Sequence, residues 1–399
     1  MAGLYFHIPF RTAPRPYDDS YYDILRDDAS GDALLQRFVD AVDAELRLYA
    51  RQYADDEPVR TIHAGGGRPS LLRLKRVRSL LATVLDVFDA SVFEESTAEI
   101  NPADATNTYL SGLQSVGFDR LSIEVLSFYP DDLHTLQAPH SGAEAVRSIR
   151  TAQAAGFNTF AVDLAFGWPQ QSMETWERNL RQAIDMGVPG ITLIEWSPTG
   201  SRDPSTSDAG SNKGDDRGKT GRDLAMRQAK QFRLATKLLE ASGYDAYELT
   251  HFALPGHASS HLRNTYAHGS YIGVGPSAES FWWPGRSPGR SATRWTNVSD
   301  VNEYIHLLSN RYPPIAYRQT SDWTALIREY IFFRLRTDSG LDLRDLEDRY
   351  GYNLHGNRGA LLDKLVDNDL VTGLDNDRVQ LTPSGRLVAD GITERLFPS

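Results

Sequence analysis

Acidic side chains lie near the ends of several apolar stretches in the first half of the chain. The clearest are Glu99 in "AEINP", Glu124 in "RLSIEV" and Asp163 in "VDLAFGWP", and Ser122 precedes Glu124 by two residues. If these stretches are parallel strands, their carboxyl ends meet at one edge of a sheet, where α/β folds bind ligands. Asp163 lies within an otherwise apolar run, so we expect its carboxyl group to have a polar partner. The alternative is that these acids are solvated charges at loop edges.

The segment "AGGGRPSLL" (64–72) follows one apolar stretch and precedes a helical pattern. Consecutive glycines let backbone N–H groups approach a ligand, and a following helix N-terminus favours an anion such as a carboxylate or phosphate. The spacing is not G-x-G-x-x-G, so a Rossmann dinucleotide site is not indicated. A tight strand-to-helix turn explains the same glycines equally well.

Histidines cluster in the second half of the chain. Four of the ten lie within "HFALPGHASSHLRNTYAHG" (251–269), together with Tyr266. Imidazole and tyrosinate are both known axial ligands of heme iron, and the flanking apolar residues suit a macrocycle. No H-E-x-x-H or two-His-one-carboxylate spacing indicates a zinc or iron site. For any single histidine, a hydrogen-bonded loop imidazole is the more ordinary interpretation.

The composition sets firm limits on function. The 399 residues include no cysteine, which excludes disulfides, thiolate nucleophiles and cysteine-ligated Fe–S clusters within this chain. The net charge of −11 disfavours nucleic acid as a partner, so any anion must be met locally by arginines. No apolar run approaches the roughly 18 residues of a membrane span. We therefore expect a cytoplasmic protein with no integral membrane segment.

These candidate residues must be positioned by alternating strands and helices. Apolar runs rich in β-branched and aromatic residues alternate with stretches that have apolar residues at i, i+3, i+4 and i+7. The expected strands are 3–10, 60–66, 91–100, 120–128, 158–166 and 190–196, and the clearest helices are 34–50, 70–88 and 172–186. This alternation predicts right-handed βαβ units and a parallel sheet, either doubly wound or closed into a complete or partial barrel.

The second half of the chain is organised differently. Residues 197–223 are almost wholly small and polar, which predicts a flexible insertion, and a helix is expected at 224–244. The Gly/Pro/Trp-rich segment 273–295 is expected to form loops. From about 316 onward, short helices followed by a small strand pair indicate a winged-helix-like C-terminal domain. We divide the chain into a barrel (1–296), a linker (297–315) and that domain (316–399).

Several motifs in order resemble the HemN/HemW family of radical S-adenosylmethionine (SAM) proteins, which includes the oxygen-independent coproporphyrinogen III oxidase and a heme chaperone. The matching segments are "HIPF" (7–10), "GGGRPS" (65–70), "EINP" (99–102), "RLSIEVLSF" (120–128), "DLAFGWPQQSMETW" (163–176), "YELTHFALPGH" (247–257) and "EYIFFRLRTDSGLDLRDLEDRYG" (329–351). The resemblance is nearest to the HemW branch. It implies a partial (β/α)6 TIM-type barrel followed by a HemN-type C-terminal domain.

The departures from the family pattern concern its cofactors. The three cysteines that hold the family's 4Fe–4S cluster fall on Arg11, Arg15 and Asp18. A guanidinium stays protonated and cannot ligate iron, so we expect no cluster and no reductive cleavage of SAM.

The resemblance also maps the SAM pocket, which is half kept. Tyr5, Gly66, Gly67, Glu99 and Asp163 match the family's SAM-contacting positions. The family's Thr, Gln and Arg contacts are replaced here by Arg68, Leu126 and Ala138. SAM binding is therefore expected to be weak.

HemW-type proteins carry an H-N-x-x-Y-W motif associated with heme, and "HLRNTY" (261–266) matches it in part. His261 is kept, and Tyr266 is an alternative ligand. The leading hypothesis is a cluster-less, non-catalytic tetrapyrrole binder that delivers heme to an acceptor protein.

Two alternatives stay open. One is a coproporphyrinogen-oxidase-like oxidoreductase of heme biosynthesis. The other is a pseudoenzyme that binds another anion at Arg11, Arg15 and Arg68, against the simpler view that Arg11 and Arg15 pair with Asp18 and Asp19 in a solvated loop.

Overall fold

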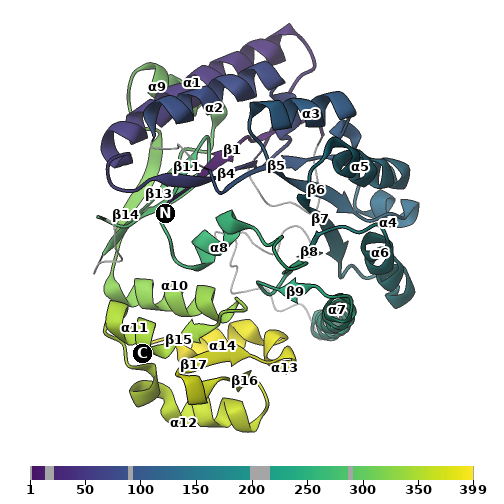
Figure 1. Cartoon of the computed structure of the whole chain (residues 1–399), viewed down its shortest axis with the longest axis vertical. Helices are drawn as coiled ribbons and strands as arrows, with labels where there is room; N and C mark the ends of the chain where they lie inside the picture. Colours follow the sequence, from purple (N-terminus) through teal and green to yellow (C-terminus); the bar gives the residue numbers. More distant parts are fainter. Residues whose placement is uncertain (1, 14–21, 89–92, 198–215, 286–290, 399) are drawn as a thin grey trace.

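The computed structural model describes residues 2–13, 22–88, 93–197, 216–285 and 291–398. Its centre is a curved twelve-stranded sheet in the order β14-β13-β12-β11-β1-β4-β5-β6-β7-β8-β10-β9. Helices cover the outer face of this sheet, and the C-terminal helices form a separate layer below it (Figure 1). The fold is a partial barrel, as the sequence predicts.

Six parallel strands form the barrel wall, and their neighbours pair in parallel register. They are β1 (Ala2–His7), β4 (Val59–Gly65), β5 (Glu95–Ile100), β6 (Arg120–Leu126), β7 (Thr159–Phe166) and β8 (Gly190–Glu195). The connecting helices are α1 (Ala29–Tyr53), α2 (Leu74–Val87), α3 (Asn107–Val116), α4 (Pro130–Thr135), α5 (Gly142–Ala155), α6 (Met173–Asp185) and α7 (Asp216–Ala241). All six expected strands are therefore present.

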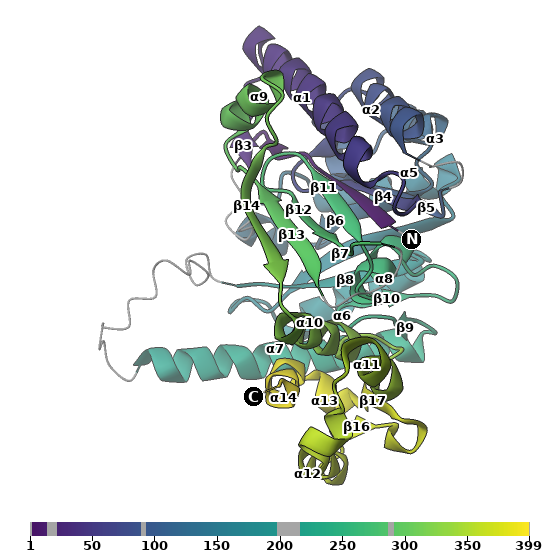
Figure 2. The ribbon, with the colours of Figure 1, turned by 90° about the vertical axis from the view of Figure 1, so that its left-hand side faces the viewer.

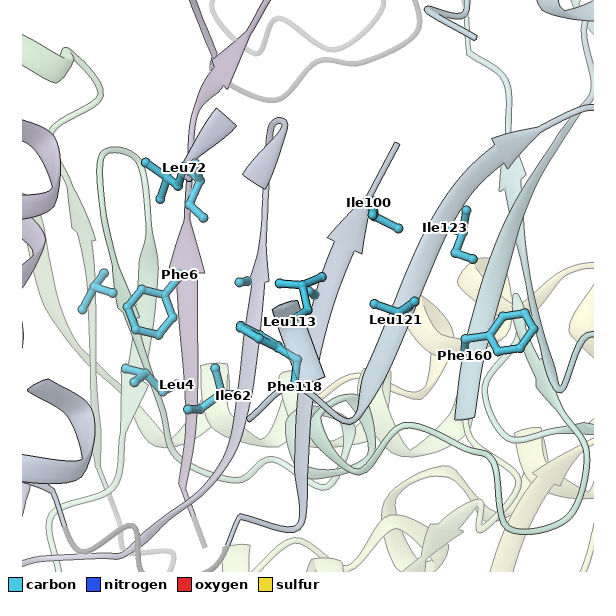
Figure 3. Packing of buried hydrophobic residues seen from close by; sticks show 14 of the residues in the cluster. Leu4, Phe6, Ile62, Leu72, Ile100, Leu113, Phe118, Leu121, Ile123 and Phe160 are labelled. Carbon is cyan, nitrogen blue, oxygen red and sulfur yellow. The ribbon is translucent and has the colours of Figure 1, made fainter. Parts of the chain in front are cut away.

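Local sequence explains where these helices begin and end. Ser141 and Glu144 form a reciprocal capping box at the start of α5. Gly156 ends α5 and Gly117 ends α3, each in the left-handed conformation that glycine adopts without steric cost. The helices pack their apolar faces against Leu4, Phe6 and the equivalent outward residues of the neighbouring strands, shown in Figure 3. This layer is the main core.

The sheet continues beyond the parallel strands on both sides. On one side β9 (Asp245–Ala246) and β10 (His251–Ala253) add antiparallel pairs to β8. On the other side β11 (Tyr271–Val274) pairs in parallel with β1. The antiparallel strands β12 (Glu279–Trp282), β13 (Ala292–Asn297) and β14 (Ile315–Ser321) follow it. The prediction of loops over 273–295 was wrong in its described part, because these strands extend the sheet and bury Trp295 against α1.

The segment expected to be a linker also differs from the prediction. Within 297–315, α9 (Val301–Ser309) buries Val301, Tyr304 and Leu308 in the barrel core, and β14 pairs with β13. The apolar spacing of α9 explains this packing. These residues therefore lie with the barrel.

The C-terminal helices surround a second core. The elements are α10 (Trp323–Leu335), β15 (Leu341–Asp342), α11 (Leu343–Tyr350), α12 (Leu354–Asp367), β16 (Val371–Thr372), β17 (Arg378–Leu381), α13 (Pro383–Arg386) and α14 (Ala389–Leu396). A small three-stranded sheet, β15-β17-β16, completes the expected winged-helix-like arrangement. Its apolar cluster includes Leu326, Tyr350 and Val379.

The polar insertion expected at 197–223 lies mostly outside the described residues. Its last part belongs to α7, which begins at residue 216, earlier than the helix expected from 224, and projects from the body of the molecule (Figure 2). Among the residues that the structure describes, no helix has the length and apolarity needed to cross a membrane.

Candidate functional site

Polar side chains line the inner face of the barrel because side chains alternate along each strand. Leu4, Phe6, Ile62, Leu121 and Ile123 point outward into the core. Polar side chains occupy the alternate positions of these strands and of their neighbours: Tyr5, His7, Thr61, His63, Glu99, Ser122, Asp163 and Thr192. Tyr5 pairs with His7, His63 with Glu99, and Asp163 with Ser122 and Thr192, whereas the partner of Thr61 is His261. The interior of a purely structural barrel is usually filled by branched apolar side chains. This interior is instead polar and suited to a ligand.

Glu99 is the centre of this lumen. Its Oε1 lies 2.9 Å from Nε2 of His63, and its Oε2 accepts a hydrogen bond of 3.0 Å from the backbone N–H of Gly66. Burial raises the pKa of Glu99, but these hydrogen bonds and the His63 charge outweigh burial and hold the pKa below its usual value. Glu99 is therefore a carboxylate, and His63 and Tyr5, whose ring centroids are 5.8 Å apart, stand beside it.

The pKa of Asp163 is shifted in the opposite direction from that of Glu99. Burial, together with the nearby charges of Glu99 and Glu124, raises the pKa of Asp163 to about 8. The side chains of Thr192 and Ser122 are its hydrogen-bond partners, and Ser122 Oγ lies 3.4 Å from Asp163 Oδ1. The expected polar partner is present. A protonated Asp163 beside an ionised Glu99 gives the lumen one acid and one base, a pair that can hold a polar ligand or exchange a proton with it.

The three glycines at 65–67 are required by the packing of the chain itself. A Cβ on Gly65 would lie 2.2 Å from Oε1 of Glu99, and one on Gly67 would lie 2.4 Å from the carbonyl oxygen of Ile8. Gly66 has a φ of +94° and faces the ring of His7. The glycines therefore serve a tight turn whether or not a ligand binds there.

Arg11 occupies one of the positions that the family pattern gives to a cluster cysteine. Its side chain is only 4% exposed, and Nη2 donates to the carbonyl oxygen of Gly66 over 3.3 Å. Its guanidinium also lies over the ring of Tyr22, 5.0 Å from the centroid. Arg11 is therefore not in a solvated loop. Arg15 and Asp18 lie outside the described residues.

The residues present do not fit a 4Fe–4S cluster. The donor set lacks any thiolate, and the one described cluster position holds a buried guanidinium that offers no lone pair. Arg68 is also engaged: Nε and Nη2 bind the carboxylate of Asp104 over 2.6 and 2.5 Å, and Nη1 binds Thr12. This pairing neutralises Arg68 and weighs against an anion site at that residue.

Two of the replaced SAM-contacting positions have become part of an apolar cluster. Leu126 is fully buried with Leu133, Leu136, Ala165 and Trp168, and Ala138 packs against them. Leu126 adopts a left-handed backbone with a φ of +59°, which costs free energy in a non-glycine residue. Polar contacts at these positions are thus replaced by hydrophobic packing, and the residues present fit SAM only in part, through Tyr5, Gly66, Glu99 and Asp163.

His261 lies at the floor of the lumen. It is carried by α8 (Ser260–Tyr266), which Figure 1 shows on the inner side of the sheet. The ring is 7% exposed, its Nδ1 lies 2.9 Å from Thr61 Oγ1, and its centroid lies 5.3 Å from that of His63. Burial and the His63 charge lower the pKa of His261 to about 3, so the imidazole is neutral.

Tyr266 leaves the same helix in a different direction. Its ring meets Phe333 of α10 edge-on, with centroids 5.9 Å apart, and its hydroxyl interacts with Glu248 and Arg336. Burial raises the pKa of Tyr266, which favours the phenol over the tyrosinate that binds iron. The structure therefore joins His261, but not Tyr266, to the lumen residues Tyr5, Glu99 and Asp163.

Sequence reasoning missed the two histidines of the lumen wall. His7 and His63 each sit two residues from another inward-facing position, so the period-2 alternation of their strands carried the signal.

The fold and lumen define a radical SAM barrel with an added C-terminal helical domain. Residues 35–183 match the Radical SAM superfamily, and residues 323–388 match the HemN C-terminal domain. The solved structure of the coproporphyrinogen III oxidase HemN from Escherichia coli covers 99% of this chain and 90% of its own, with a TM-score of 0.78 at 19% identity.

The curated relatives narrow the family further. The Escherichia coli protein "Heme chaperone HemW" is 32% identical over 69% of this chain and 69% of its own length. The Mycobacterium tuberculosis protein of the same name is 27% identical over 99% and 94%. The chain belongs to the HemN/HemW family of the radical SAM superfamily.

Proposed function

We propose that this protein binds heme or a related tetrapyrrole without radical chemistry, and that it delivers the bound molecule to an acceptor protein. The observation that carries the proposal is the chemistry at Arg11: a buried guanidinium occupies a cluster position in a chain that has no cysteine. The burial of Leu126 in place of a polar SAM contact supports the same conclusion. Any residual affinity for SAM would be weak.

Relatives named heme chaperone supply the ligand class. Within this chain, His261 is the candidate axial ligand because a neutral imidazole is the form that binds iron. Because His261 is buried, heme can reach it only by entering the lumen to its full depth or after a movement of α8. Tyr266 would require the loss of its contacts with Glu248 and Arg336 as well as deprotonation.

A hemin titration followed at the Soret band tests the proposal. We expect a saturable shift with the unmodified protein, loss of that shift with His261→Ala, and no change with His306→Ala, because His306 is an exposed histidine on a helix. Absence of a saturable shift would exclude specific heme binding. A shift that survives His261→Ala would keep heme binding and remove His261 as its ligand.

The alternative function, a coproporphyrinogen-oxidase-like oxidoreductase, would need a bound iron–sulfur cluster. It requires iron and sulfide to be retained after anaerobic reconstitution and desalting, which the residue chemistry at Arg11 opposes. Retained iron and acid-labile sulfide, with cleavage of added SAM, would replace the proposed function by that alternative.

A further inference from the structure

A cleft lies between the barrel and the C-terminal domain, apart from the lumen. Its volume is about 500 Å³. Phe232 and Ala229 of α7 and Phe166 of β7 line it from the barrel side, and Val388 and Gly391 line it from the C-terminal side. Volumes of 300 to 1,000 Å³ and positions between domains are typical of small-molecule sites.

The cleft leaves apolar surface uncovered. Val388 is 49% exposed, and Phe232 is only partly buried. Exposed apolar surface in a concave site is stabilised when a ligand removes it from water. The occupant should therefore have an apolar body.

Two arginines stand where this cleft joins a second hollow of about 260 Å³, since Arg336 and Arg386 line both. Arg336 Nε donates to Glu248 over 2.8 Å, and Arg386 Nη1 donates to Glu240 over 2.9 Å. Each guanidinium carries five N–H groups in a rigid fork. Arg386 pairs with one carboxylate, so it still presents donors to a second anion, whereas Arg336 also meets Asp390 and keeps fewer N–H groups for a ligand.

Two carboxylates, Glu195 and Asp390, also line the cleft. Asp390 lies 3.4 Å from Arg336 Nη1, and its side chain is 80% exposed, so water and salt screen its charge. We propose that this cleft binds an apolar molecule that carries a carboxylate, with the carboxylate at Arg336 and Arg386 and the apolar body against Phe232 and Val388.

This inference goes beyond the proposed function because it places a ligand away from His261. Tetrapyrroles with propionate groups are one member of the ligand class. Metal-free protoporphyrin IX is the chosen probe, because its binding needs no iron ligand and therefore does not require His261 as an axial ligand.

Two helical glycines give a matched pair of variants. Gly391 of α14 lines the cleft, Gly221 of α7 does not, and a Cβ on either would meet no atom within 4 Å. Neither has a positive φ, so a side chain can start from either position without a clash at its Cβ atom. We expect Gly391→Trp to weaken protoporphyrin IX binding at least about tenfold and Gly221→Trp to leave it unchanged. Arg386→Gln should weaken it by about tenfold through loss of a charged hydrogen bond.

The outcomes separate the two proposals. No binding of protoporphyrin IX by the unmodified protein, or equal affinity in all variants, overturns the cleft. Hemin binding that needs His261, together with protoporphyrin IX binding that Gly391→Trp leaves unchanged, keeps the proposed function and rejects the cleft. If Gly391→Trp abolishes protoporphyrin IX binding and the unmodified protein shows no specific hemin binding, the cleft is kept and the proposed function is rejected. If Gly391→Trp does not fold, by circular dichroism, Gly391→Leu and Arg386→Gln decide.

Discussion

The guanidinium of Arg11 lies 3.3 Å from the carbonyl oxygen of Gly66, which joins the loop after β1 to the glycine turn after β4. In the family pattern these two segments hold a metal cluster and a cofactor. Here a direct protein contact links them. A side chain that has become part of the protein's own packing is difficult to exchange for a ligand.

Removing this contact should destabilise the barrel. Arg11→Ala leaves the partly buried carbonyl of Gly66 without the Arg11 donor and creates space beside Tyr22, so we expect a loss of about 1–3 kcal/mol in the free energy of unfolding. Urea titration measures it. Arg37→Ala is the control, because Arg37 is exposed on α1 and should change stability by no more than about 0.5 kcal/mol. Equal losses in both variants would contradict a structural role for Arg11.

Leu126 offers a second test of the replaced SAM pocket. Leu126→Gln places a polar side chain at a fully buried position within an apolar cluster, which should cost about 2–4 kcal/mol of stability. Leu85→Gln is the matched control, since Leu85 is 58% exposed. A Leu126→Gln protein as stable as the unmodified chain would show that this region is open rather than packed.

Asp163 predicts a particular dependence of stability on pH. Its folded pKa of about 8 exceeds the unfolded value of 3.8, so the folded state binds the extra proton between those values. The contribution of Asp163 to stability therefore falls as pH rises from about 4 to about 8. Asp163→Asn removes the group, so the variant should gain stability relative to the unmodified protein between about pH 5 and about pH 9. A difference that is independent of pH would mean that Asp163 is ionised throughout.

For Glu248, at the contact between the barrel and α10, we expect stability to depend on pH in the opposite direction. Burial raises its pKa, but the hydrogen bond and charge of His251 and the charge of Arg336 outweigh burial and lower the pKa to about 2. The lowered pKa contributes stability above about pH 4.5, and that stability is lost as pH falls towards about 2.

Glu248→Gln should cost about 3–5 kcal/mol at neutral pH, because it leaves Arg336 without its buried partner. Urea unfolding at about pH 7 and about pH 3 measures both effects. Asp390→Asn removes the exposed partner of the same arginine and should cost no more than about 1 kcal/mol. A loss for Glu248→Gln no larger than that of Asp390→Asn would rule out a strong buried pair.

The sequence by itself determined the six strands and the absence of thiolate ligands, because apolar periodicity and residue chemistry are local properties. Periodicity left a doubly wound sheet and a barrel open, and only the order of the family motifs favoured the barrel. The sequence also indicated Glu99 and Asp163 as members of one site, since parallel strands bring their carboxyl ends together. Their opposite protonation could not be predicted: both are carboxyl groups on strands, and only the folded chain puts His63 and Gly66 N–H beside Glu99 and puts negative charges beside Asp163.

Tertiary structure also decided the fate of the segments after residue 250. The aromatic and glycine-rich stretch before 296 has the composition of loops, yet it forms strands because an open sheet edge and the face of α1 lie next to it. His261 and Tyr266 are five residues apart on one short helix, and a helix of 3.6 residues per turn points them in different directions. Which of them meets the lumen depends on how α8 packs, a long-range contact that no local pattern encodes.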